Sequence, residues 1–132
     1  MQTYSIISRT KNSAIKKMAI ASSLPIYQQT YELVSNLVTW TENFPRKYKY
    51  TLGEKLINVA LELFEYIQLA NMSIENRSRH LTGFTIKLEL LKTLLRLCFD
   101  RKLFSLKQQA DICRLTTIIG RQATGWGRSG RV

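Results

Sequence analysis

Residues 79–102 read RHLTGFTIKLELLKTLLRLCFDRK, and this stretch decides the fold class. Apolar side chains recur in it three and four positions apart, the spacing that places them on one side of an α-helix. The main stripe consists of Leu81, Phe84, Leu88, Leu91, Leu95 and Cys98, and a wider margin consists of Ile86, Leu90, Leu94 and Leu97. This apolar surface is wider than one bundle core requires. Two interpretations stay open: part of the helix faces another subunit, or the helix is central and fully covered.

Three further segments have the same helical period, without strand-like alternation or hairpin signals. The first runs from about Leu24 to Phe44, with Ser23 as its cap and Pro25 in its opening turn. The second opens at Thr51 with the capping-box spacing TLGE and has the stripe Leu52, Leu56, Val59, Leu63, Ile67 and Ala70. The last opens at Ser105 with the similar SLKQ and runs to about Gly120 or a little beyond, with a predicted inner face of Leu106, Ala110, Cys113 and Thr117.

Short polar links between four helices predict an all-α fold, an up-down-up-down antiparallel four-helix bundle. A length of 132 residues allows one domain. We expect a flexible basic segment over 1–22, the bundle over 23–122, and a Gly/Arg-rich basic tail over 123–132. No apolar run approaches the ~18 residues of a membrane helix, and no secretory signal opens the chain. These features predict a cytoplasmic protein without a membrane partner.

Residues suited to catalysis or metal binding are few. Cys98 and Cys113 both fall on apolar stripes, which predicts buried thiols. His80 has no second histidine as a partner, and Glu62 and Glu65 share a helix face without one. We therefore predict no metal, no cofactor and no enzymatic activity.

The formal charge of +11 is concentrated on particular segments. Residues 77–104 contain seven basic against two acidic side chains, whereas residues 24–44 contain two acidic and no basic ones. Such a field attracts polyanions, and nucleic acid bound through phosphates without strong sequence specificity is the predicted partner. The alternatives are an ordinary solvated surface and an acidic partner protein on a helical scaffold. The candidate binding residues are Arg46, Lys47, Lys49, Arg77, Arg79, Lys87, Lys92, Arg96, Arg101, Lys102, Arg121, Arg128 and Arg131, with Tyr48 and Tyr50 as candidates for base stacking.

Three aromatic side chains and one arginine have specific expectations. Trp40 and Phe44 should cover one end of the bundle, and Trp126 should either dock back onto the helices or lie at a subunit interface, docking being the favoured alternative. Arg96 either binds the polyanion or forms an i,i+4 salt bridge with Asp100. The loop cations before the second helix lie where exposed backbone N–H groups also favour phosphate.

Four stretches carry a family resemblance. They are Ser23-Leu24-Pro25-Ile26-Tyr27 with Tyr31-Glu32-Leu33, Phe44-Pro45-Arg46-Lys47-Tyr48-Lys49-Tyr50-Thr51-Leu52-Gly53, Leu94-Leu95-Arg96-Leu97-Cys98 followed by Ser105, and Ile119-Gly120-Arg121 leading to Gly125-Trp126. From about residue 23 onward the chain resembles the accessory variability determinant (Avd) proteins of diversity-generating retroelements. Four-helix proteins encoded by insertions in ribosomal RNA genes share a similar loop, whereas the LLRL helix and the Gly-Trp end favour Avd.

The resemblance implies a homopentameric, ring-like barrel of bundles with a positively charged surface. That surface would bind the element's reverse transcriptase and its template RNA or cDNA, in the cytoplasm of a bacterial, archaeal or phage-infected cell. The protein would support mutagenic cDNA synthesis and retrohoming without chemistry of its own. The resemblance carries binding roles over to Arg46, Lys47, Lys49, Arg96 and Arg121, and the primary ligand among polymerase, RNA and DNA stays open.

Overall fold

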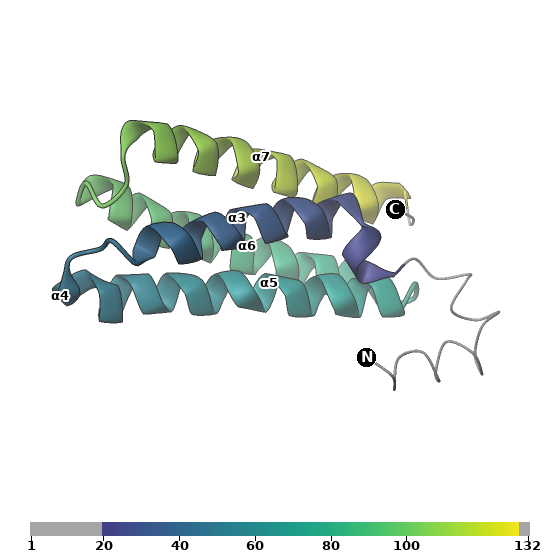
Figure 1. The fold of residues 1–132 in the computed structure, drawn as a ribbon. Coiled ribbons are helices and arrows are strands. Elements are labelled where there is room, and N and C mark those ends of the chain that lie inside the picture. Colours follow the sequence, from purple (N-terminus) through teal and green to yellow (C-terminus); the bar gives the residue numbers. More distant parts are fainter. Residues whose placement is uncertain (1–19, 130–132) are drawn as a thin grey trace, which may run out of the picture.

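The computed structural model describes residues 20–129, and this part of the chain is built from helices without strands. Its long helices are α3 (Pro25–Thr41), α5 (Glu54–Met72), α6 (Arg77–Asp100) and α7 (Leu106–Ser129). Short helical turns precede two of them: η1 (Ala21–Ser23), α4 (Arg46–Tyr48) and the π-helical η2 (Lys49–Gly53). Successive long helices run in opposite directions (Figure 1), which confirms the predicted four-helix bundle.

Each long helix packs against two neighbours, so the bundle closes around one core. Contacts join α3 to α5, α5 to α6, α6 to α7 and α7 to α3. The predicted stripes of α5 and α6 are buried except for Leu52, which is half-buried. At Gly83 of α6 a Cβ atom would clash with the ring of Tyr66 on α5. Glycine is therefore required there for the two helices to approach closely.

The margin of α6 divides into a covered and an exposed part. Leu94 is buried, whereas Ile86, Leu90 and Leu97 are exposed. Within the described chain α6 is thus not fully covered, so the interpretation of a central and fully covered helix is wrong. The helix begins at Arg77 and ends at Asp100, two residues before the predicted bounds at each end.

Two predicted helix caps are absent. Ser23 does not cap α3: its hydroxyl donates to the carbonyl oxygen of Ile20 at 2.7 Å, and Leu24 is the N-cap residue. Pro25 occupies the first helical position, as predicted. Thr51 does not open a helix, because the chain is already helical from Arg46 onward and the threonine hydroxyl donates back to the Lys47 carbonyl at 2.7 Å.

The Ser105 cap of α7 is confirmed in both directions. The amide of Gln108 donates to the Ser105 hydroxyl at 3.1 Å, and the Ser105 amide donates to the Gln108 side chain at 2.9 Å. This reciprocal pair satisfies two backbone donors that the first turn leaves free.

The predicted inner face and end of α7 are wrong. Leu106, Ala110, Cys113 and Thr117 are exposed, and the face that packs on the bundle consists of Ile112, Leu115, Thr116, Ile119, Ala123 and Trp126. Burial of the last two keeps the chain helical to Ser129, so the predicted boundary at residue 122 falls inside α7. The larger side chains take the core because they remove more apolar surface from water.

Aromatic rings cover the end of the bundle where α3 leads to α4. The rings of Trp40, Phe44 and Phe99 surround Phe104, with centroids 5.2–6.2 Å away. The predicted cap of Trp40 and Phe44 is confirmed, since Phe44 is buried and Trp40 is half-buried. The expectation of a flexible segment over 1–22 lies mostly outside the described residues. Among the helices from Pro25 to Ser129, none is both long and apolar enough to cross a membrane.

Candidate nucleic-acid interface

The predicted basic residues divide between an open groove, one end of the bundle and paired or buried positions. The groove lies between α6 and α7 and has a volume of about 550 Å³. Its charged lining residues are Lys92, Arg121 and Arg128 against Glu89, and its other lining residues are Thr85, Leu88, Thr116, Thr117, Gly120, Thr124 and Gly125. Three basic side chains against one acidic one leave this groove positively charged.

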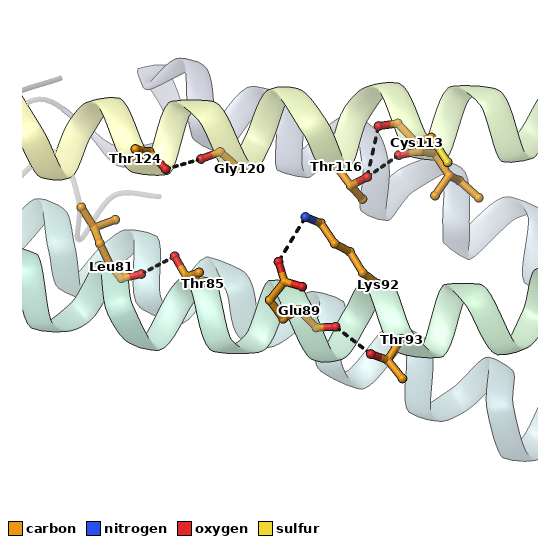
Figure 2. Close-up of polar contacts among 10 residues, drawn as sticks. Leu81, Thr85, Glu89, Lys92, Thr93, Cys113, Thr116, Gly120 and Thr124 are labelled. Atoms are coloured by element: carbon orange, nitrogen blue, oxygen red, sulfur yellow. Dashed lines mark hydrogen bonds and ion pairs between the residues drawn. The ribbon is translucent and has the colours of Figure 1, made fainter.

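Figure 2 shows how the two helices present polar groups to the groove. The ammonium of Lys92 reaches into the space between the helices and meets Glu89 at 3.2 Å. The hydroxyls of Thr85 and Thr124 donate to carbonyl oxygens one turn earlier, at 3.0 and 3.1 Å. Their lone pairs remain as acceptors, since the proton is already used. The groove therefore combines cationic donors with hydroxyl acceptors.

Arg121 and Arg128 are the uncompensated cations of the groove. Both are exposed, and no ion pair within residues 20–129 involves either of them. Glu89 and Lys92 form only an exposed i,i+3 pair, a kind that contributes little to stability. A phosphate group can thus approach the groove without displacing a strong internal partner.

Two of the predicted binding residues are engaged in contacts within the bundle. Lys87 of α6 donates to Glu62 of α5 at 2.8 Å, and this hydrogen bond, together with the carboxylate charge, raises the pKa of Lys87. Arg77 is buried, so its predicted place on the surface is wrong. Its Nε donates to the carbonyl oxygen of Ala70 at 2.8 Å, and its guanidinium lies over the Trp126 ring at 5.0 Å. Trp126 is itself buried, which confirms its predicted docking.

A second basic surface lies at the aromatic end of the bundle. Arg46 and Lys47 are exposed in the turn that begins the path into α5, and Lys49 follows half-buried. Arg101 and Lys102 are exposed in the turn after α6. Lys47 and Arg101 line the same notch, so two predicted segments far apart in the sequence meet here.

The two tyrosines proposed for base stacking differ in accessibility. Tyr50 is 62% exposed, and the ammonium of Lys49 lies 5.8 Å from its ring centroid. Tyr48 is half-buried against the core, with the Lys47 ammonium 5.0 Å from its ring centroid. Tyr50 can therefore offer a ring face to solvent, whereas only part of the Tyr48 ring is accessible, where it lines the notch.

The remaining candidates lie singly on the surface. Arg79 is exposed in the first turn of α6, and Arg96 is exposed further along the same helix. The ion pairs among the described residues do not include Arg96, so the alternative of a salt bridge to Asp100 is not realised. Arg131 lies outside the described residues.

The described residues contain no cluster of three or more His, Cys, Asp or Glu side chains that could hold a metal ion. Cys98 is buried as predicted, and burial raises the pKa of its thiol to about 11. Cys113 is exposed, which corrects its predicted burial.

A family model described as bAvd-like matches residues 24–130. The chain belongs to the bAvd-like family. Neither a curated protein nor a solved structure gives a significant match to it. The family assignment confirms the resemblance inferred from the four sequence stretches, and it covers every long helix of this bAvd-like bundle.

Sequence reasoning missed the small polar residues that open the groove. Thr117, Arg121, Thr124 and Arg128 follow one another at spacings of four, three and four, so a helix places them on one face. The signal was present, but it becomes visible only when α7 is continued beyond Gly120. Of the predicted residues in this stretch, Arg121 and Arg128 come together in the groove with Lys92 of α6.

Proposed function

We propose that this protein is a non-catalytic accessory protein of a diversity-generating retroelement. It binds the element's reverse transcriptase and its template RNA or cDNA through its basic surface, and it thereby supports mutagenic cDNA synthesis and retrohoming. Membership of the bAvd-like family over residues 24–130 is the observation that carries this proposal. The site of action is the cytoplasm, where the enzyme and its template meet.

The charge distribution supplies the physical means. The formal charge of +11 gives a long-range attraction for polyanions, and the α6–α7 groove offers Arg121 and Arg128 free of internal carboxylate partners among residues 20–129. Contacts of this kind recognise the phosphate backbone, so binding is expected to be weakly sequence-specific and steeply salt-dependent. Such a surface can hold a template near an enzyme without reading its sequence.

In the same proposal several copies assemble into a ring-like homo-oligomer. The exposed apolar margin of α6 is the physical argument, since Ile86 and Leu90 face solvent in the single chain. Apolar side chains gathered on one helix face are typical of surfaces that another subunit covers. A pentamer is the number that the family resemblance implies.

Co-purification with the reverse transcriptase encoded beside this gene tests the proposal. The full chain is captured before and after nuclease treatment, at low and at high salt, and both polymerase and template RNA are measured. Capture of the polymerase that survives nuclease and salt establishes a direct complex. Capture that disappears with nuclease places the nucleic acid between the two proteins. Absence of both polymerase and RNA in the untreated sample contradicts the proposal.

A charge-matched pair of variants then assigns the surface. We expect Arg121→Gln combined with Arg128→Gln to lower retention of template RNA, because both groove cations are removed. Lys55→Gln combined with Lys107→Gln removes the same charge from exposed positions outside the groove. Equal losses in the two double variants would contradict a role for the groove and indicate only the overall field.

A further inference from the structure

A notch at the aromatic end of the bundle has a composition that the groove lacks. Its volume is about 350 Å³, at the small end of the range of ligand pockets, roughly 300–1,000 Å³. It is lined by Lys47, Tyr48, Thr51, Leu52, Leu97 and Arg101. These are two cations, an aromatic ring, a hydroxyl and two aliphatic side chains, without a carboxylate.

The two cations reach the notch from different elements. Lys47 comes from α4, and Arg101 caps the C-terminal end of α6. No ion pair among residues 20–129 involves either of them. Two cations without an acidic partner beside one small hollow attract an anionic group together. A phosphate suits them because its oxygens can accept hydrogen bonds from both side chains.

Local structure holds the backbone from which each cation extends. The Lys47 ammonium lies over the Tyr48 ring at 5.0 Å, and the Lys47 carbonyl accepts the Thr51 hydroxyl at 2.7 Å. Arg101 is held by the turn after α6, where its amide donates to the carbonyl oxygen of Leu97 at 3.2 Å. The π-helical turn that carries Thr51 and Leu52 is a feature often found at functional sites.

The floor of the notch is apolar and open to solvent. Leu97 is 37% exposed although it is a large aliphatic residue, and Leu52 and Tyr48 are half-buried beside it. A phosphate or a carboxylate alone gains nothing from such a floor. A nucleobase does, because its flat apolar face loses contact with water there.

We propose that this notch binds one nucleotide of a single-stranded nucleic acid. The phosphate lies between Lys47 and Arg101, and the base lies against Leu52, Leu97 and the Tyr48 ring. A duplex fits less well, since its base faces are stacked inside the helix and only its phosphates can reach the cations. This inference rests on the proposed binding of nucleic acid and assigns to one place the step in which unpaired template or cDNA is held.

The test compares two double variants of the full chain in titrations with short labelled oligonucleotides. Lys47→Gln with Arg101→Gln removes both notch cations, and Lys55→Gln with Lys107→Gln removes the same charge outside the notch. We expect the notch variant to bind oligothymidylate about 10- to 30-fold more weakly than the wild type. Its slope of log affinity against log salt should become shallower by about 0.7, the value for the one single-strand phosphate that the two cations share. The control variant should keep the wild-type slope.

A second series tests the floor. The affinity of the wild type for an abasic oligonucleotide of equal length should be lower than its affinity for oligothymidylate by a factor of about five or more. Leu97→Ala should reduce that difference while it leaves binding of the abasic chain unchanged. A duplex of the same length should show no such dependence on Leu97.

The outcomes separate this inference from the proposed function. If the wild type binds no oligonucleotide, the binding of nucleic acid itself is wrong. If it binds but the two double variants lose affinity equally, or the abasic chain binds as well, the notch is not a nucleotide site. If the notch variant keeps its oligonucleotide affinity but loses nuclease-resistant capture of the polymerase, the notch binds an acidic protein side chain, and the inference is overturned.

Discussion

At the scale of single residues, Lys102 has a backbone conformation that disfavours its own side chain. Its φ is +57°, and it directly follows Arg101, the C-cap residue of α6. Its amide donates to the Phe99 carbonyl at 2.9 Å, and the next amide, of Leu103, donates to the Cys98 carbonyl at 3.0 Å. This pair of bonds is the Schellman motif, in which glycine is the usual residue at the left-handed position. Lysine there costs free energy that glycine does not.

We therefore expect Lys102→Gly to raise the free energy of unfolding by about 0.5–1 kcal/mol. Urea titration followed by circular dichroism measures the change. Arg101→Gly is the matched control, because Arg101 has a φ of −91° and glycine gains nothing at that position. Stabilisation by both substitutions, or by neither, would contradict the conformational explanation.

Cys98 makes the stability of the core depend on alkaline pH. Burial raises the pKa of its thiol from an ordinary value of 9.0 to about 11. Below pH 9 the thiol is protonated in both the folded and the unfolded chain, so its contribution is fully present. Between pH 9 and 11 the unfolded chain loses this proton and the folded chain keeps it, so stability falls by about 1.4 kcal/mol per pH unit. Urea titrations across this range should show a shallower decline for Cys98→Ala, and equal declines would contradict burial as the cause.

At the scale of the elements, the last two turns of α7 depend on what they bury. Trp126 packs beneath the guanidinium of Arg77, which also binds the carbonyl of Ala70 at the end of α5. This contact joins the ends of three helices. We expect Trp126→Ala to lower the free energy of unfolding by about 3–5 kcal/mol, the range for a buried Trp. Trp126→Phe keeps a ring under the guanidinium and should cost less. Wild-type stability of the alanine variant in urea titration would show that the end of α7 is not part of the core.

Some features of the helices depend only on residues close together in the sequence, and others depend on packing between helices. The α6 stripe and the Ser105 capping box were predicted correctly, because both depend on side chains within a few residues. The Thr51 cap was wrong because the helix had already begun, after Pro45, and the π-helical turn joins this start to α5. The register of α7 was wrong because two adjacent faces both have helical spacing. Packing against α3 and α6 chooses between them, and a single helix does not contain that information.

At the scale of the whole molecule, the sequence shows which segments contain the basic side chains. It does not show which of these side chains have acidic partners in the fold. Lys87 is neutralised by a glutamate on α5, and Arg114 meets Glu32 of α3 at 3.3 Å. Arg77 is covered by Trp126, which lies near the C-terminal end of the chain. Conversely, Lys47 and Arg101 line one notch only because the fold brings α4 to the end of α6. Segment counts therefore predicted a positively charged protein, whereas the fold decides which cations are free, paired or buried.

Assembly is the property that only the complete surface decides. Ile86 is 63% exposed and Leu90 is 39% exposed, one turn apart on α6, and burying both against another copy removes apolar surface from water. If the proposed ring uses this face, Ile86→Glu with Leu90→Glu places charges in the interface and should reduce the assembly to a species of 15.3 kDa. Light scattering coupled to gel filtration measures the mass. Leu106→Glu is the control, since Leu106 is 83% exposed at the start of α7, a different helix, and should leave the mass unchanged. A wild type that is already monomeric, or a double variant that keeps the wild-type mass, would place any subunit contact elsewhere on the bundle.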